Sequence, residues 1–321
     1  MLWQSYTARL TEFILVIILL GLFGLSITNL FFIEIPNEKI TETSLAITDP
    51  QNNPPLITDQ REGVNNFKNK TKFIQSLKFL LGDQVSNYGI YIKDLESGQE
   101  YGINQDQIFA PASISKLPYS ILTLRYIDES KLDYYDSLIL QQKHKSYKTD
   151  PLYNFPNGSS WTIRDLLRLL LVDSDNVPMA MLEEYFGGVE NFNKQAQEIG
   201  VGGLTRYPHQ TTPRAVGKIF EKIYTGEILS EKSNNQLKEY LSKYKAFSSD
   251  RIRRGVIQGG GDGNQIVHKI GNLAGVYHDA GYVSSPGGDF IIVTLNQNRT
   301  PAQAVSEINA ISKATYIYFN Q

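Results

Sequence analysis

The sequence predicts an α+β fold in which a five-stranded antiparallel sheet is flanked by helices and carries an inserted all-α lobe. Two strand-like segments come early in the chain and three come late, and the segment between them has a mainly helical pattern. Because two short strands are only marginally stable alone, we expect all five to share one sheet. The helical block then packs beside that sheet, and the cleft between such lobes is a common place for an active site.

The two early strands are expected in residues 87–109, which read NYGIYIKDLESGQEYGINQDQIF. Tyr88, Ile90 and Ile92 alternate with small or polar residues, and this two-residue period is typical of a strand. The Glu-Ser-Gly sequence of residues 96–98 is typical of a turn, so the segment is expected to form a hairpin. A helix is predicted just before the hairpin from the spacing of its apolar residues, which are Phe73, Leu77, Phe79, Leu80 and Leu81.

The three late strands are expected at residues 265–271, 275–285 and 289–297. A glycine-rich loop, QGGGDGN at residues 258–264, precedes them, and a closing helix is expected through PAQAVSEINAISKATYIYF at residues 301–319. The Pro-Gly-Gly sequence of residues 286–288 is expected to form the turn between the last two strands. No internal repeat is visible in the sequence.

The N-terminal segment predicts a membrane anchor. Residues 13–33 read FILVIILLGLFGLSITNLFFI, which carries no charge and is long enough to cross a bilayer as a helix. No small-residue cleavage site follows, so we expect an uncleaved anchor and keep a signal peptide as the alternative. Residues 1–12 would then be cytoplasmic, 34–66 would be a polar, proline-containing linker, and 67–321 would be a folded domain outside the cytoplasm.

Composition excludes several classes of site. The 321 residues carry a formal net charge of −2, which gives no reason to expect a nucleic-acid partner. There is no cysteine, so disulfides, thiolate nucleophiles and lipid-modified cysteines are excluded. No metal or cofactor is expected, because none of the four histidines shows a ligand spacing; they are His144, His209, His268 and His278. We expect the protein to be a monomer.

Three short motifs carry the candidate chemistry. In chain order they are SISK at residues 113–116, SDN at 174–176 and HKIGN at 268–272. Each is weak alone, and a second serine-x-x-lysine match at Ser242 and Lys245 shows that chance produces such patterns. The second match lies within a helical pattern, where it is expected to be part of an ordinary helix face.

Ser113 is the candidate nucleophile. It follows a strand-like segment and a tight turn and opens an apolar helix, so the unpaired N–H groups and dipole of the helix would favour negative charge there. Lys116 lies one turn further along the same face, and a partly desolvated lysine can act as the base that takes the serine proton. The alternative is that Ser113 merely caps the helix.

The SDN motif lies between two apolar helical runs, which suggests a break that faces the cleft. There Ser174 could relay a proton to the leaving group, and Asn176 could hold the amide of a substrate. The alternative is that Ser174 or Asp175 caps the helix that starts at Val177.

The third motif is expected on a strand. Lys269 would project into the cleft as a positive charge, and Gly271 would let a substrate backbone approach closely. Asn272 could offer its backbone N–H beside that of Ser113 and so complete an oxyanion hole. The alternative is an ordinary lysine on an ordinary strand.

These three motifs, in this order and in this setting, resemble those of the class A β-lactamases and penicillin-binding serine enzymes over residues 67–321. FAPASISKLP looks like that family's nucleophile segment, LVDSDN like its second motif, and VHKIG followed by HDAGYV like its third motif and the next strand. TTPRAVGKIF looks like the helix after the family's omega loop.

The resemblance implies a β-lactamase/D,D-peptidase-like fold and an acyl-enzyme on Ser113, with Lys116 as its base and Ser174 as proton relay. Asn176 and Lys269 would bind the substrate, a β-lactam or a peptidoglycan stem peptide. The oxyanion donors would be the N–H groups of the nucleophile and of Asn272.

Two departures from the family pattern matter. Class A β-lactamases carry an omega-loop glutamate that activates the deacylating water, whereas residues 202–210, GGLTRYPHQ, contain no acid. Tyr207 and His209 are the side chains in that segment that could replace it. Ile270 stands where the family usually has threonine or serine. We therefore expect acylation followed by slow deacylation. The alternatives are a D,D-peptidase-like enzyme, a general esterase and a non-catalytic protein that binds muropeptides.

Overall fold

The computed structural model describes residues 61–204, 209–243 and 250–321, with side chains from residue 70 onward. These residues belong to a compact unit, Asp59–Gln321. The expected cytoplasmic segment, residues 1–12, and the expected anchor, residues 13–33, lie outside the described residues. Within the described part of the chain, no helix has both the length and the apolar character that crossing a membrane requires.

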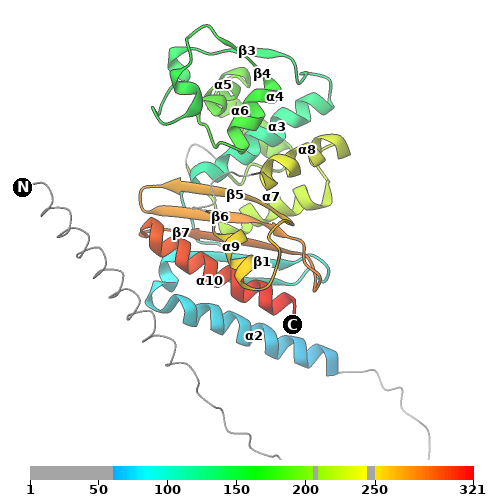
Figure 1. The fold of residues 1–321 in the computed structure, drawn as a ribbon. Coiled ribbons are helices and arrows are strands. Elements are labelled where there is room, and N and C mark those ends of the chain that lie inside the picture. The colour runs from blue at the N-terminus through cyan, green and yellow to red at the C-terminus, as the bar shows by residue number, and fades with distance from the viewer. Residues whose placement is uncertain (1–60, 205–208, 244–249) are drawn as a thin grey trace, which may run out of the picture. The chain divides into compact units, whose positions relative to one another are not determined.

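The predicted sheet is confirmed. Five strands, all antiparallel, lie in the order β2-β1-β7-β6-β5 (Figure 1). Their bounds are β1 Tyr88–Asp94, β2 Glu100–Ile103, β5 Ile266–Leu273, β6 Val276–Val283 and β7 Phe290–Asn296. The pairing of β1 with β7, in which Ile90 lies opposite Thr294, joins the two ends of the domain as the sequence predicted.

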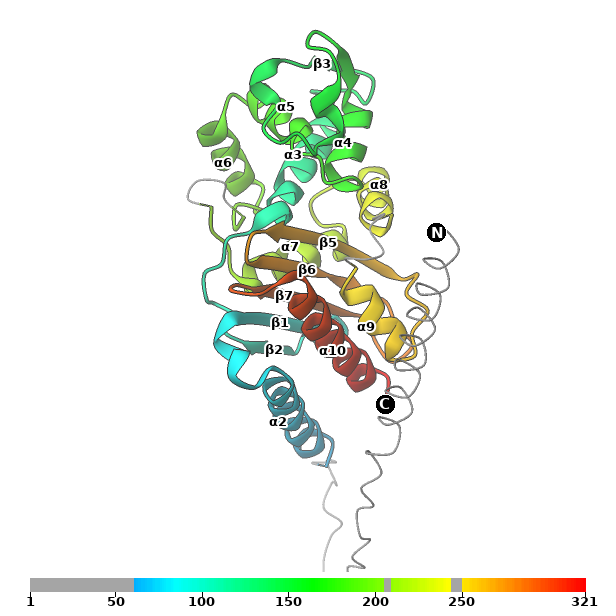
Figure 2. The same ribbon diagram turned by 60° about the vertical axis from the view of Figure 1, so that its left-hand side comes forward.

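Helices cover both faces of the sheet (Figure 2). Helices α2 (Arg61–Leu81), α9 (Ile252–Gln258) and α10 (Pro301–Phe319) lie on one face, where Ile90 and Ile92 join their core. Helix α7 (Pro213–Thr225) covers the other face, where Tyr91 and Val293 belong to the larger core shared with the helical lobe. Strand alternation places successive residues of β1 in different cores, so each strand holds the two layers together.

Helix α2 departs from the expectation in two ways. It begins at Arg61, inside the segment expected to be linker. Of its apolar residues, Phe73, Leu77 and Leu81 are buried, whereas Phe79 is 88% exposed and Leu80 is 44% exposed. The buried three recur every four residues, which is the spacing of one helix face, and the other two point away from the sheet.

The inserted lobe is mainly helical, as predicted. It contains α3 (Lys116–Asp128), α4 (Ile163–Leu171), α5 (Val177–Tyr185) and α6 (Val189–Glu198), with α8 (Glu231–Ser242) packed against α3 and α4. It also contains a short hairpin, β3 (Ser137–Ile139) paired with β4 (Ser160–Thr162), so the lobe is not all-α. Each of these strands has only three residues, too few for the sequence to show a period.

Candidate active site

The structure brings the three predicted motifs together. The Lys116 Nζ atom lies 3.2 Å from the Ser113 Oγ and 3.1 Å from the Ser174 Oγ. The Lys269 Nζ atom lies 3.1 Å from the same Ser174 Oγ. Four side chains therefore form a continuous chain of polar contacts. They come from the turn before α3, the start of α3, the turn before α5 and strand β5. Ser242, the serine of the second serine-x-x-lysine match, donates its hydroxyl hydrogen to the carbonyl of Glu239 at the end of α8.

Ser113 lies in a tight turn rather than at a capped helix end. It belongs to the 3-10 turn η2, Ala112–Ser115, which leads directly into α3. The residue at the cap of α3 is Ser115, and it makes no side-chain capping bond. Ala112 has a φ of +49°, which is unfavourable for a residue with a Cβ. Such a backbone persists only where its surroundings enforce it, and it turns the Ser113 hydroxyl toward Lys116.

Gly271 contributes to the site in a way that differs from the expectation. A Cβ atom at this position would lie 3.1 Å from the carbonyl oxygen of Pro111 and 3.1 Å from the Cβ of Ala112. The space that the glycine leaves is thus filled by the turn that carries the nucleophile. Gly271 allows β5 to pack closely on that turn, and we correct the interpretation that it leaves room for a substrate backbone.

The SDN turn is held from beneath by Asp175. This buried carboxylate accepts hydrogen bonds from the backbone N–H of Leu152 and of Val177, both at 2.8 Å. The bond to Val177 ties Asp175 to the first residue of α5, while the cap position of this helix is Asn176, which makes no side-chain capping bond. Ser174 does not cap it: with a φ of +56° its hydroxyl is directed to the two lysines.

Lys116 is almost completely buried, with 1% of its surface exposed. Burial lowers the pKa of its ammonium group to about 8, although the carboxylates of Asp150 and Asp175 act in the opposite direction. Near neutral pH a significant fraction of Lys116 is therefore the neutral amine, which is the form that can accept a proton from Ser113.

Lys269 is buried, and its Nζ atom contacts the SDN turn at Ser174. Its Nζ atom also donates to the carbonyl oxygen of Ile270, at 3.2 Å. Burial and the neighbouring charge of Lys116 lower the pKa of Lys269 well below its usual value. Its contact with the Ser174 hydroxyl connects Lys269 to the nucleophile through Ser174 and Lys116, and the expected binding of substrate by Lys269 stays a prediction.

Arg251 supports the third motif and was missed in the sequence. Its buried guanidinium group donates to the side-chain Oδ1 of Asn272 at 2.8 Å and to the carbonyl of His278 at 2.9 Å. These bonds fix the end of β5 that carries the predicted oxyanion donor. The sequence around it, DRIRRG, reads as an ordinary charged helix start, and no local signal marks this arginine as buried.

A cavity of about 440 Å³ opens above the nucleophile. Predicted residues line it, namely Ser113, Lys116, Asn176 and Asn272, together with His209 and Tyr147. None of the described lining residues is acidic. Ile270 is buried and is not part of this lining, so its apolar side chain does not face the cavity.

Asn176 has an unexpected partner. Its side-chain Nδ2 donates to the Oδ1 of Asp150 at 2.9 Å. Asp150 lies immediately before the 3-10 turn η4, Pro151–Asn154, and is 6% exposed. A carboxylate can only accept here, so it fixes which side of the Asn176 amide faces the lobe.

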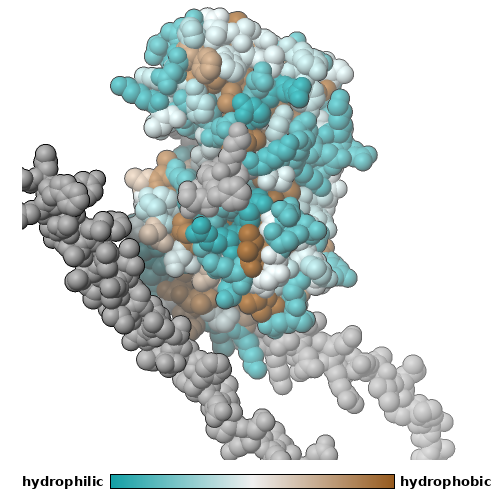
Figure 3. Space-filling model, viewed as in Figure 1, coloured by the Kyte–Doolittle hydropathy of each residue, from teal (hydrophilic) through white to brown (hydrophobic). Residues whose placement is uncertain are grey.

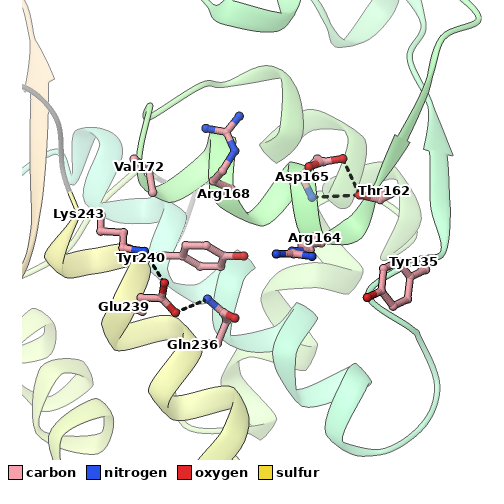
Figure 4. Close-up of a pocket in the computed structure, with 10 residues that line it drawn as sticks. All are labelled: Tyr135, Thr162, Arg164, Asp165, Arg168, Val172, Gln236, Glu239, Tyr240 and Lys243. Carbon is pink, nitrogen blue, oxygen red and sulfur yellow. Dashed lines mark hydrogen bonds and ion pairs between the residues drawn. The ribbon is translucent and has the colours of Figure 1, made fainter.

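A second cavity of about 530 Å³ lies between α4, α8 and the small hairpin (Figure 4). Arg164, Arg168 and Lys243 bring positive charge to it, and Asp165 and Glu239 bring negative charge. Lys243 is bonded to Glu239, and Arg168 is bonded to Asp173. The charges are thus largely paired, and no residue of the three motifs lines this cavity.

The buried group formed by Asp250, His268 and Asp279 is the described cluster with the composition of a metal site. Both carboxylate oxygens of Asp279 are engaged within the protein: the His268 Nδ1 lies 2.8 Å from the Asp279 Oδ1, and the Asp279 Oδ2 accepts from the N–H of Ile252. Burial opposes a charged imidazole, but the two carboxylates raise the pKa of His268. A metal requires a neutral imidazole, so these residues fit an internal ion cluster better than a metal site.

The surface shown in Figure 3 is mainly hydrophilic, with small groups of hydrophobic residues between the polar ones. Such scattered apolar residues are normal for a protein surface.

Comparison with known proteins connects this site to a family. Residues 71–319 match a family described as the Beta-lactamase enzyme family. β-Lactamase VEB-1 from Pseudomonas aeruginosa is 24% identical over 261 residues, which cover 72% of this chain and 85% of that protein. The structure of PBP-A superposes with a TM-score of 0.70 at 25% identity and covers 78% of this chain and 96% of its own.

A mutant of PBP-A solved as an acyl-enzyme complex with penicillin G superposes with a TM-score of 0.68, also at 25% identity. This match covers 78% of this chain and 97% of the other. The family match spans most of the chain and includes all three motifs. The chain therefore belongs to the β-lactamase enzyme family, as a class A β-lactamase-like serine hydrolase domain.

Proposed function

We propose that this protein opens β-lactam rings, or cleaves a related amide of cell-wall peptides, by forming an ester on Ser113. The observation that carries the proposal is the 3.2 Å contact between Ser113 and the buried amine of Lys116, on the wall of the 440 Å³ cavity. A serine beside a base of lowered pKa is the arrangement that nucleophilic catalysis requires.

In the acylation step, the Ser113 Oγ attacks the carbonyl carbon and transfers its proton to the neutral Lys116 Nζ. The new C–O bond forms as the amide C–N bond breaks, and the leaving nitrogen needs a proton. The Ser174 Oγ lies 3.1 Å from Lys116 and can pass that proton on, while Lys269 holds the hydroxyl from the other side. The N–H groups of Ser113 and Asn272 would bind the developing oxyanion.

Deacylation is expected to be the slow step. Hydrolysis of the ester needs a water and a general base, and a missing base costs about 10²–10⁴-fold in rate. The described lining of the cavity offers no carboxylate for this task. The similar PBP-A mutant that was solved as an acyl-enzyme complex with penicillin G supports a long-lived ester. A penicillin-binding or D,D-peptidase-like role, with a peptidoglycan stem peptide as substrate, is therefore the second candidate, and a non-catalytic muropeptide-binding protein is the third.

The remaining features of the proposal concern location and assembly. Residues 13–33 would anchor the protein in the membrane, with residues 1–12 in the cytoplasm and residues 34–66 as a linker. Residues 67–321 would act outside the cytoplasm as a monomer. The uncharged run of 21 residues supports the anchor.

Burst kinetics test the proposal. The purified domain is mixed with a chromogenic β-lactam, and product is followed from the first turnover. The proposal predicts a burst close to one product per enzyme, followed by a steady state slower by about 10²-fold or more. Rapid turnover without a burst would contradict slow deacylation and would make His209, which lines the cavity, the first residue to replace. Absence of both burst and turnover would contradict the enzymatic proposal itself.

A further inference from the structure

The loop before η4 brings a second buried carboxylate to the active site. The backbone N–H of Asp150 donates to the carbonyl of Tyr147, and the Asp150 carbonyl accepts from the N–H of Tyr153. The N–H of Leu152 is held by Asp175 of the SDN turn. The backbone on both sides of Asp150 is thus fixed, and one of its anchors is the catalytic turn itself.

The Asp150 side chain is not used to cap the turn that it precedes. Its Oδ1 accepts the 2.9 Å bond from Asn176, and its Oδ2 has no hydrogen-bond partner among the described residues although it is buried. Burying a carboxylate oxygen without a hydrogen-bond partner costs free energy, and this indicates that its negative charge acts on a neighbouring group.

The neighbouring charge is that of Lys116. Burial is the main influence on the pKa of Lys116, and the negative charge of Asp150 is the largest influence that opposes it, ahead of Asp175. Lys269 approaches from β5 and contacts Ser174, and Tyr147 and His209 are the other titratable groups on the cavity wall. The two oxygens of Asp175 accept hydrogen bonds from two backbone N–H groups, whereas the Asp150 Oδ2 accepts none from the described residues.

The Asn176 amide is held by the same carboxylate. Its amide nitrogen carries two hydrogens, and the bond to Asp150 uses one of them. Because Asn176 also lines the cavity, its second amide hydrogen can donate to a ligand there. The carboxylate thus orients the amide and at the same time places a negative charge near the candidate base.

We propose that Asp150 is a positioning residue of this site, which orients the amide of Asn176 toward the substrate and sets the pH above which Lys116 can act as the base. The inference rests on the proposed function, because it concerns the acylation of Ser113. Without the negative charge of Asp150 the ammonium form of Lys116 is less favoured, so the amine becomes neutral at lower pH.

The test measures the rate of penicillin acylation as a function of pH and of penicillin concentration. In Asp150→Asn, which keeps an acceptor for Asn176 but removes the charge, the midpoint of the pH profile should fall by about one unit or more. Well below both midpoints the variant should acylate about tenfold or more faster than the wild type. Asp150→Ala should show the same fall and should also need more penicillin for half-maximal rate, because Asn176 loses its partner.

Two controls complete the design. Asp150→Glu keeps the charge and should keep the midpoint, and Asp83→Asn removes one exposed carboxylate in η1 (Gly82–Asn87), remote from the three motifs, and should change nothing. An unchanged midpoint in Asp150→Asn would overturn the inference, as would failure of both neutral variants to fold, since Asp150 would then serve the fold alone. If the wild type forms no penicillin adduct at any pH, the proposed function fails. If it forms an adduct and the pH profile is the same in the wild type and in Asp150→Asn, only the inference about Asp150 fails.

Discussion

Lys116 holds its amine 3.2 Å from the hydroxyl oxygen of Ser113, inside a protein interior that lowers the pKa of the amine to about 8. Only the neutral amine can take the serine proton, so the acylation rate should rise with pH and reach half its maximum near pH 8. Replacing Lys116 by methionine should slow acylation by about 10²–10⁴-fold, the usual contribution of a general base. Stopped-flow measurements with a reporter penicillin give both quantities.

Lys243→Met is the matched control, because it removes an exposed lysine that pairs with Glu239 on the lobe surface. It should leave the profile unchanged. An acylation rate that is flat between pH 6 and 9, or that survives Lys116→Met, would mean that another group takes the proton.

His278 should make the fold sensitive to acid. Its Nδ1 accepts the N–H of Asn296, so the Nε2 carries the proton and donates it to the carbonyl of Ala110, just before the nucleophile turn. Burial lowers the pKa of His278 to about 4. Between about pH 4 and 6.5 the unfolded chain therefore binds more protons than the folded chain, and stability should fall as pH drops through that window.

The size of the effect follows from the difference in pKa and is on the order of 3 kcal/mol. Urea unfolding of the wild type and of His278→Gln, each at pH 4.5 and 7, isolates this contribution from that of the buried acids. The gap in unfolding free energy between the two proteins should narrow at the lower pH. The same difference in unfolding free energy at pH 4.5 and at pH 7 would show that the His278 imidazole is protonated in the folded protein at the lower pH.

Arg251 should matter for stability and for acylation together. Its bonds to Asn272 and to the His278 carbonyl tie the end of β5 to the adjoining strand from within the core. Arg251→Ala should lower the free energy of unfolding by about 3 kcal/mol, the cost of stranding buried polar partners, and should also slow acylation. Arg251→Lys should rescue little, because a single ammonium cannot span both acceptors. Full activity in a folded Arg251→Ala would contradict this account.

The features that could be predicted from the sequence were those with a regular period or a fixed order along the chain. Strand periods at both ends predicted the five-stranded sheet, and the order of SISK, SDN and HKIGN predicted which side chains would meet. Tertiary contacts decided the rest. Gly271 looked like an opening for substrate, but the carbonyl of Pro111 occupies that space. Arg251 and Asp150 lie in unremarkable polar sequence, and only the packing of distant elements buries them beside Asn272 and Asn176.

The anchor is tested by fractionation. If residues 13–33 span the bilayer uncleaved, the full-length protein should remain in the membrane fraction through a carbonate wash, and a chain that begins at residue 34 should not. Protease added outside the cell should digest the catalytic domain. A mature N-terminus near residue 34 would show instead that the segment is a cleaved signal peptide.

The central claim is that Ser113 becomes acylated, and intact-mass spectrometry of the domain after incubation with penicillin tests it most directly. The wild type and Ser242→Ala should both gain the mass of one penicillin, because Ser242 belongs only to the chance repeat of the motif. Ser113→Ala should gain nothing while unfolding at the temperature of the wild type or close to it. An adduct that persists in Ser113→Ala would contradict the account.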